Sequence, residues 1–246
     1  MPELGANENR RYYDAFAETY ERERGQAHRG SYHDLLDELE AEFVRRFASG
    51  KDVLEVGCGT GLVLERIARF ARSAAGVDIS PNMLERARKR HLDVQVGSAT
   101  ALPFEANRFD VACAFKVLAH VREIDVALSE MARVVRPGGH VLAEFYNPWS
   151  LRGLVKRWGG PRSIAPGLDE AHVFTRYDSP RMAKSLVPPG CRWVDSRGVR
   201  IFIPTARVMR MRGLRDLFRF AERQMCDSPL KALGGFWIAA FEKVAD

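Results

Sequence analysis

Three glycines at alternate positions follow a short apolar run, and this stretch carries the clearest chemical meaning in the chain. Residues 53–61 read Val-Leu-Glu-Val-Gly-Cys-Gly-Thr-Gly, and a helical pattern follows from Leu62 to Phe70. Glycine permits positive φ and lets a ligand approach the backbone with no Cβ in the way. The first turn of a helix offers unpaired N–H groups. The stretch therefore predicts a strand, a tight turn and a helix start that together hold a ligand.

Two acidic residues accompany this turn. Glu55 lies two residues before the first glycine, and Asp78 ends a second apolar run at 74–77. An acid about 20 residues after the first glycine can accept both ribose hydroxyls of a bound nucleoside. Ser80 and Pro81 then predict a helix start, as N-cap and first helical residue. The Gly-x-Gly-x-Gly spacing differs from the Gly-x-Gly-x-x-Gly of dinucleotide dehydrogenases, which argues against a nicotinamide oxidoreductase.

The elements that position these residues alternate along the chain. Helical spacing of apolar residues predicts helices at 8–24 and 32–48. The pattern then predicts strand 52–56, helix 61–71, strand 74–78, helix 81–90, strands 92–96 and 109–115, helix 124–135 and strand 139–146, with a turn at 137–139. Such alternation is typical of parallel strands joined by crossover helices. After Pro148 it predicts a loop-rich insertion at 149–168, a helix from 178, a strand at 192–203, a helix at 205–225 and a strand at 236–244.

Taken in order, these signatures resemble those of the class I S-adenosylmethionine (SAM)-dependent methyltransferases, in particular enzymes of quinone biosynthesis and other small-molecule members. The resemblance covers about residues 10–148 and includes the glycine turn, the segment 76–87, the loop 94–104, the strand from Phe109 and the turn at 130–139. It implies an α/β, Rossmann-like, doubly wound sheet of seven mostly parallel strands with the last antiparallel. A helical N-terminal segment and a C-terminal cap insertion would complete it.

The resemblance also implies a set of residues that bind SAM. The glycines would pass close to the methionine part, Glu55 would meet its ammonium group, and Asp78 would bind the ribose. The family usually has Asp at the position of Ser98, so adenine recognition departs here from the family pattern. The full set is Tyr20, Glu55, Gly57, Cys58, Gly59, Gly61, Asp78, Ile79, Met83, Ser98, Ala99 and Lys116. For Met83 and Lys116 the alternatives are a helix-core residue and a solvated lysine.

His120 is the best candidate for a general base. It follows the fourth predicted strand, near the point where the methyl group is expected, and an imidazole with a pKa of about 6.5 suits proton removal from a phenol or enol. A structural histidine is the alternative. Tyr146 and His172 are weaker candidates. Tyr12, Tyr13 and Tyr20 resemble the N-terminal segment that folds over SAM in small-molecule members, with core packing as the alternative.

Composition narrows the class of protein. The residues are 46% hydrophobic and 28% charged, which is ordinary for a soluble globular chain. A chain of 246 residues is also long enough to form one core. No apolar run reaches the roughly 18 residues of a membrane span, and the N-terminus shows no secretory pattern, so we expect a cytoplasmic protein. The cysteines are far apart, so no metal site is indicated. We expect a single methyltransferase domain over 1–246, with a cofactor core at about 50–148 and an acceptor or cap region at about 149–233.

The predicted function is methyl transfer from SAM to an oxygen or carbon of a small organic or lipid-like acceptor. The alternative is an RNA or protein methyltransferase that uses the Arg-rich segment 151–223, since the net charge is +6. The motifs of base-modifying enzymes are absent after the fourth strand, which argues against nucleic acid. In helix 205–225 we expect the apolar stripe to pack on the core with its arginines in water. A weak contact with an anionic membrane is the alternative there. The sequence indicates no oligomeric state.

Overall fold

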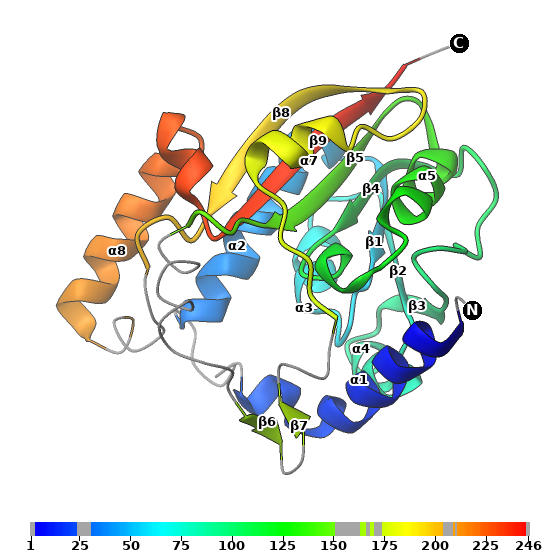
Figure 1. Cartoon of the computed structure of the whole chain (residues 1–246), viewed down its shortest axis with the longest axis horizontal. Helices are drawn as coiled ribbons and strands as arrows, with labels where there is room; N and C mark the ends of the chain where they lie inside the picture. Colours follow the sequence, from blue (N-terminus) through cyan, green and yellow to red (C-terminus); the bar gives the residue numbers. More distant parts are fainter. Residues whose placement is uncertain are drawn as a thin grey trace.

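Seven strands form one sheet in a computed structural model that describes residues 3–23, 31–150, 163–165, 168–169, 174–203, 209 and 211–244. The strand order is β3-β2-β1-β4-β5-β9-β8 (Figure 1). The strands are β1 (Asp52–Val56), β2 (Ser73–Asp78), β3 (Asp93–Val96), β4 (Phe109–Ala114), β5 (Val135–Tyr146), β8 (Cys191–Val199) and β9 (Phe236–Lys243). Strands β1 to β5 pair in parallel, and β9 runs antiparallel to both β5 and β8. The predicted sheet, including its antiparallel last strand, is confirmed.

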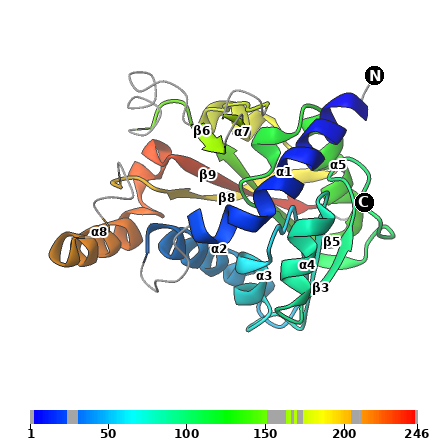
Figure 2. The ribbon, with the colours of Figure 1, turned by 90° about the horizontal axis from the view of Figure 1, so that it is seen from below.

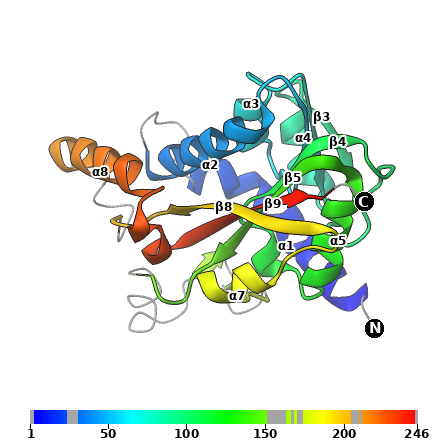
Figure 3. The same cartoon turned by 90° about the horizontal axis from the view of Figure 1, so that it is seen from above.

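Helices cover both faces of this sheet. α2 (Tyr32–Ala48), α3 (Leu62–Ile67) and α4 (Pro81–Arg88) lie on one face, and α5 (Ile124–Val134) and α7 (Pro180–Ser185) lie on the other (Figure 3). The remaining elements are α1 (Glu3–Glu23), the short helix η1 (Leu118–His120), the hairpin β6 (Ser163–Ala165) and β7 (Leu168–Asp169), α8 (Arg212–Met225) and η4 (Pro229–Leu233). None of the helices within the described ranges is both long and apolar enough to cross a membrane.

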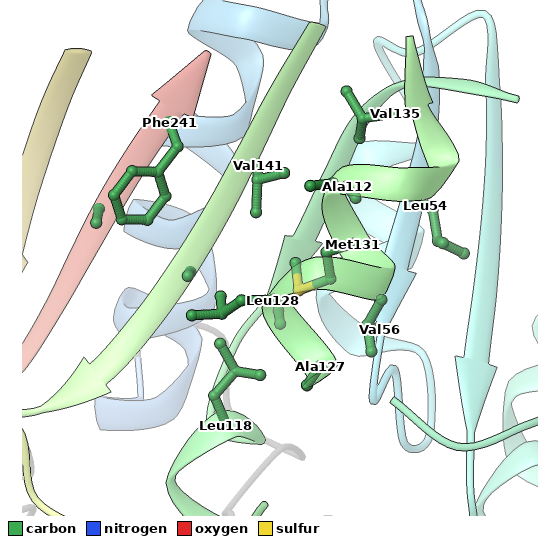
Figure 4. Packing of buried hydrophobic residues seen from close by; sticks show 14 of the residues in the cluster. Leu54, Val56, Ala112, Leu118, Ala127, Leu128, Met131, Val135, Val141 and Phe241 are labelled. Carbon is green, nitrogen blue, oxygen red and sulfur yellow. The ribbon is translucent and has the colours of Figure 1, made fainter. Parts of the chain in front are cut away.

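The core follows from the alternation of side chains along each strand. In β4, Val111 and Cys113 face α2, whereas Ala112 and Ala114 face α5. On the α5 side, Leu128 and Met131 pack against the central strands, as Figure 4 shows. These side chains are fully or almost fully buried. Packing between the two helical layers therefore holds the central strands β1, β2 and β4 in place. The adjacent carboxyl ends of β1, β2 and β4 form the floor of the site described below.

Helix α1 lies across the carboxyl ends of the parallel strands (Figure 2). Its Asp14 accepts a hydrogen bond from the Ser80 hydroxyl at 2.5 Å and from the backbone N–H of Asn82 at 3.3 Å. Arg90 donates to Glu21 at 2.7 Å. Because Ser80 is also the N-cap of α4, whose hydroxyl accepts from Met83 N–H, α1 is attached directly to the turn that follows β2.

Several predicted boundaries differ from the structure. The predicted turn at 137–139 lies inside β5, where the register with β4 jumps between the pairs Phe109–Val135 and Val111–His140 as a β-bulge. The predicted strand 192–203 ends at Val199, because Arg200 takes a left-handed conformation with φ +64°. The predicted helix 205–225 is seen as α8 from Arg212, and most of the predicted insertion 149–168 lies outside the described residues.

The orientation of α8 is the reverse of the prediction. Its Arg219 and Arg223 face α2, where both donate to the Glu38 carboxylate, at 2.8 and 2.7 Å. Its apolar Leu217 and Phe220 are 60% and 63% exposed. The expectation of a core-packed stripe with arginines in water is therefore wrong, apart from the half-buried Phe218, which packs against the core. Ion pairing with the acidic outer side of α2 decides the orientation.

Candidate active site

A cavity of about 460 Å³ lies at the carboxyl ends of β1, β2 and β4. It joins the two groups of residues that the sequence singled out separately, the glycine turn with Asp78 at one end and His120 at the other. Eleven of the twelve predicted cofactor residues line it, namely Tyr20, Glu55, Gly57, Cys58, Gly59, Asp78, Ile79, Met83, Ser98, Ala99 and Lys116. Gly61 does not line it. That glycine is the N-cap of α3, where a Cβ would lie 2.4 Å from Leu92 Cδ1.

The glycine turn is shaped for close approach from the cavity. The backbone N–H groups of Gly57 and Cys58 donate to the Val77 carbonyl at 2.7 and 3.1 Å, which ties the turn to β2. Gly57 has φ +72°, and a Cβ there would lie 2.0 Å from Val117 Cγ2. Gly59 has φ +53°, but a Cβ there would meet no atom within 4 Å. Gly57 is therefore required by packing, whereas Gly59 leaves room that belongs to the cavity.

Asp78 holds the turn as well as facing the cavity. One carboxylate oxygen accepts from Gly59 N–H and the other from Ser80 N–H, both at 2.8 Å. Burial raises the pKa of this carboxyl, and the backbone hydrogen bonds from Ser80, Gly59 and Ile79 oppose that rise. A carboxylate has about four lone-pair sites, so these backbone donors do not fill it. Asp78, the predicted ribose ligand, therefore also positions the glycine turn beside which the cofactor is expected to bind.

Glu55 is almost fully buried beneath the turn, with 3% of its surface exposed. Its Oε2 atom is closed to water and has no hydrogen-bond partner among the described residues. Burial raises its pKa well above the usual range, helped by Glu40, Asp37 and Asp78 and opposed by Lys116. A buried carboxyl oxygen without a donor is costly, so a cation arriving from the cavity would be strongly favoured here.

Lys116 lines the cavity, but its ammonium group is bound elsewhere. Its Nζ donates to both carboxylate oxygens of Glu40, at 2.5 and 2.7 Å, and to Asp37 at 3.3 Å. Its backbone N–H donates to Glu144 Oε1 at 3.0 Å, and the Lys116 backbone is left-handed with φ +59°. The sequence treated this residue as a cofactor ligand or a solvated lysine. The structure places it over a buried acidic group, so the solvated alternative is wrong.

The opposite wall of the cofactor end comes from α4 and the loop after β3. Met83 is 2% exposed and contributes to both the core and the cavity wall. The Ser98 hydroxyl contacts Thr100 Oγ1 at 2.8 Å and accepts from Thr100 N–H at 3.2 Å. Ser98 therefore shapes a local turn and brings Thr100, which the sequence reasoning missed, to the cavity wall.

His120 occupies the far end of the cavity, on η1. Its Nδ1 atom lies 2.9 Å from the Phe174 carbonyl oxygen and 3.3 Å from Thr175 Oγ1. Its ring is 6.3 Å from the Tyr13 ring and 5.8 Å from the Tyr146 ring. Burial and neighbouring tyrosines raise the pKa of Tyr13 well above its usual range, so this hydroxyl stays neutral. His172 lies outside the described residues.

Several site residues were not found from the sequence. Phe174 lies in the segment after the insertion, which has no recognisable pattern, and it lines the cavity beside Arg122, whose guanidinium lies 4.4 Å from its ring centre. Glu40 and Glu144 are fully buried. A signal for Glu144 was available, because a charged residue interrupts the otherwise apolar run at 141–145. Glu40 gave no such signal, since an acid on a helix is normally exposed.

Comparisons with known proteins find similarity to methyltransferases. Residues 54–143 match the family model described as a methyltransferase domain. A demethylmenaquinone methyltransferase from Tropheryma whipplei is 35% identical over 141 residues, which are 55% of this chain and 53% of that protein. A ubiquinone biosynthesis O-methyltransferase from Chelativorans is 34% identical over 96 residues, 37% of this chain and 38% of that protein. The chain thus spans about half the length of the first of these relatives and less of the second.

A solved structure shows the same fold over nearly the whole chain. The SAM-dependent methyltransferase of Thermotoga maritima described as a possible histamine N-methyltransferase superposes with a TM-score of 0.65 at 21% identity. The match covers 94% of this chain and 98% of that one. The chain has the fold of the class I methyltransferases. Residues 54–143 are thus similar to a methyltransferase domain, and the chain has the fold of a SAM-dependent methyltransferase, as the sequence predicted.

Proposed function

We propose that this protein transfers a methyl group from SAM to an oxygen or carbon of a small organic or lipid-like acceptor. The observation that carries the proposal is the continuous cavity that joins the glycine turn and Asp78 to His120. The names of the two quinone-biosynthesis relatives support an acceptor of this kind. We also propose that residues 1–246 act as one domain, with the cofactor core at about 50–148 and the acceptor region at about 149–233.

The residues present fit SAM at one end of the cavity. Glu55 would bind the ammonium group, since its Oε2 is buried without a donor among the described residues. The room beside Gly59 would take the methionine chain, and Asp78 would accept the ribose hydroxyls with its remaining lone pairs. Ile79, Met83, Ser98 and Ala99 would enclose the adenine. When bound, SAM supplies an already activated methyl group, so the protein chiefly binds, orients and excludes water.

In this proposal His120 is the general base. A backbone carbonyl can only accept a hydrogen bond, so the contact between Nδ1 and the Phe174 oxygen assigns the proton of the neutral ring to Nδ1. The other ring nitrogen, Nε2, is then the basic atom. A neutral imidazole held in one tautomer can remove the proton of an acceptor hydroxyl or activated carbon as the methyl group arrives.

The surroundings of His120 support an acceptor with an aromatic ring. Tyr13 and Phe174 line the cavity with Phe115, Val121 and Val126, and these side chains form an aromatic and apolar wall. Such a wall buries a flat apolar ring, while the histidine can contact a hydroxyl at its edge. Phenols, catechols and reduced quinones share this chemistry. Oxygen and carbon both remain acceptor atoms in this proposal, because either requires loss of one proton.

The arginines of the C-terminal part favour this reading over RNA or protein methylation. Arg197 forms two hydrogen bonds with Asp227, at 3.0 and 2.6 Å, and Arg192 forms two with Glu242. Arg176 pairs with Asp178, and Arg219 and Arg223 of α8 pair with Glu38 of α2. A phosphate backbone would have to compete with these partners. Among the described residues, these arginines therefore form ion pairs within the fold.

We also propose that α8 contacts an anionic membrane. Leu214, Leu217 and Phe220 of α8 and its N-cap residue Met211 are exposed at every third position, so they form a slanted apolar stripe that winds partway around the helix. A helix with such a stripe can lie in the lipid interface, where a lipid-like acceptor is found. Co-sedimentation with anionic and neutral vesicles at low and high salt tests the contact. Failure to sediment with anionic vesicles at low salt would leave only soluble acceptors.

Methyl transfer is tested with SAM labelled in its methyl group and a panel of reduced acceptors. The panel would hold a demethylmenaquinol, a prenylated catechol, a simple catechol and transfer RNA. We expect label in the organic extract with one of the first three and none on the RNA. Calorimetry with SAM alone provides the control for the cofactor site. Absence of SAM binding by a folded protein would contradict the proposed function.

A further inference from the structure

One arginine lies among the described residues that line the cavity, and methyl transfer as proposed above gives it no role. Arg122 follows His120 by two residues and lines the same end of the cavity. It is exposed, so it lies where the cavity opens to solvent. Its guanidinium lies 4.4 Å from the centre of the Phe174 ring. Within the described part of the chain, this guanidinium forms no hydrogen bond or ion pair.

Phe174 holds both polar side chains at this end of the cavity. Its carbonyl oxygen lies 2.9 Å from His120 Nδ1, and its ring lies against the Arg122 guanidinium. The attachment continues two residues later, where Arg176 N–H donates to the Ala119 carbonyl at 2.8 Å. His120 and Arg122 are neighbours but one in the chain, so their Cα atoms are at most about 7 Å apart. One residue therefore places the imidazole and the guanidinium relative to each other.

Helix α5 does not explain a cation at this position. Arg122 precedes Glu123, the N-cap of α5, where the positive end of the helix dipole lies. The dipole favours the carboxylates of Glu123 and of Asp125 in the first turn, but it disfavours an arginine. The contact with Phe174 contributes only modestly at an exposed position. The two acids thus have a structural reason for their places, whereas Arg122 requires another one.

The chemistry of the guanidinium indicates what it would bind. It carries five N–H donors in a rigid planar fork that matches a carboxylate. The Phe174 ring offers these donors no lone pair, so they are available to a ligand in the cavity. Glu123 also lines the cavity, and its charge disfavours a doubly negative group such as a phosphate. A singly charged carboxylate is therefore the better partner for Arg122.

We propose that Arg122 determines acceptor specificity by binding a carboxylate on the aromatic ring of the acceptor, and that Phe174 positions it. The inference rests on the proposed function, because it takes the methyl acceptor as the ligand at this end of the cavity. The acceptor class narrows from phenols in general to phenolic acids, whose hydroxyl meets His120 and whose carboxylate meets Arg122. The carboxylate stays ionised and takes no part in the transfer of the methyl group.

The carboxylate is tested with two ligands that differ only in that group, 3,4-dihydroxybenzoate and catechol. Calorimetry on enzyme saturated with S-adenosylhomocysteine should show that the acid binds about tenfold more tightly. Arg122→Gln should remove this preference by weakening the acid about tenfold and leaving catechol unchanged. Arg122→Lys should retain part of it, because a lysine keeps the charge but not the fork. In turnover with labelled SAM, the loss in Arg122→Gln should appear in KM and not in kcat.

Variants of Phe174 test the positioning. Phe174→Leu removes the ring and should lower the preference for the acid about threefold, again through KM. Phe174→Tyr keeps a ring and should retain the preference. Arg181→Gln removes an exposed arginine of α7 that does not line the cavity, so it controls for net charge and should change nothing.

The results separate this inference from the proposed function. Equal affinity for acid and catechol in the wild type, no binding of the acid, or a preference that persists in Arg122→Gln would overturn the role of Arg122. Methylation of catechol alongside any of these results would leave the proposed function in place. Selective binding of the acid without methyl transfer from bound SAM would support the role of Arg122 and count against the proposed function.

Discussion

Asp78 and Gly59 are joined by a hydrogen bond of 2.8 Å, in which the backbone N–H of the glycine turn donates to the carboxylate at the end of β2. The other carboxylate oxygen accepts from Ser80, whose hydroxyl contacts Asp14 of α1. One side chain thus connects the turn, the start of α4 and the helix that lies over the strand ends. Because these parts converge on Asp78, its replacement tests the cofactor site most directly.

Asp78→Ala should weaken SAM binding about a hundredfold. Each hydrogen bond to a charged group contributes about 1.5–3 kcal/mol, and water replaces part of the loss, which leaves about 3 kcal/mol. Calorimetry measures the change, and circular dichroism checks that the variant is folded. Glu105→Ala is a suitable control, because Glu105 is an exposed acid and does not line the cavity. Unchanged SAM affinity in the folded Asp78 variant would exclude Asp78 as the ribose ligand.

Gly59→Ala should abolish or greatly weaken SAM binding with only a small loss of stability. A left-handed alanine costs about 1–2 kcal/mol, and the new Cβ meets no protein atom but enters the cavity. Gly138→Ala is the matched control, since Gly138 has φ +78° and an equally open Cβ position on β5, outside the cavity lining. Both variants should lose similar stability in urea, and only the first should lose the cofactor. Equal SAM affinity in both would mean that Gly59 serves only the turn.

His120→Ala should lower kcat by about a hundredfold or more while SAM affinity stays close to that of the wild type. The reason is that His120 lies at the acceptor end of the cavity, remote in sequence from the glycine turn. The pH–rate profile should lose the acidic limb that reports protonation of the imidazole. His91→Ala is the control, a histidine outside the cavity lining. A variant with full turnover and an unchanged pH profile would show that proximity alone accounts for catalysis.

Asp227→Asn should remove a pH-dependent part of the stability. Burial raises the pKa of Asp227, but the hydrogen bonds from Arg197 and Arg46 outweigh it and lower that pKa to about 2. A carboxyl with a depressed pKa stabilises the fold above its unfolded pKa of about 4, and this stabilisation is lost as pH falls towards 2. Because Asp227 is partly exposed, we expect a loss of only about 1 kcal/mol at pH 7.

The measurement for Asp227 is urea unfolding of wild type and variant at pH 7 and at pH 3. The difference in free energy of unfolding should shrink between the two conditions. Asp216→Asn is the control, because the side chain of Asp216 is 68% exposed and pairs only with its neighbour Arg215 among the described residues. A difference that stays constant with pH would mean that the ion pair with Arg197 does not contribute.

The local sequence pattern was sufficient to predict most of the sheet and the residues that line the cofactor end of the site. The apolar run before the glycines gave β1 at Asp52–Val56 without error, and helical spacing gave α2 at Tyr32–Ala48. Glycine, Ser80 and Pro81 act through their own backbone and side-chain preferences, so their roles were predictable from the residues alone. The family resemblance then placed Glu55, Asp78 and His120 at strand ends that share one edge of the sheet.

Other features depended on partners far away in the chain, and only the tertiary structure decided them. Lys116 meets Glu40 across 76 residues, His120 meets Phe174 across 54, and Arg219 meets Glu38 across 181. The same amphipathic pattern on α8 permits either face to be buried, and the acids on α2 select the charged one. Sequence periodicity determines which faces exist, whereas long-range charge pairing and burial determine which face turns inward and which acids lie beneath the cavity.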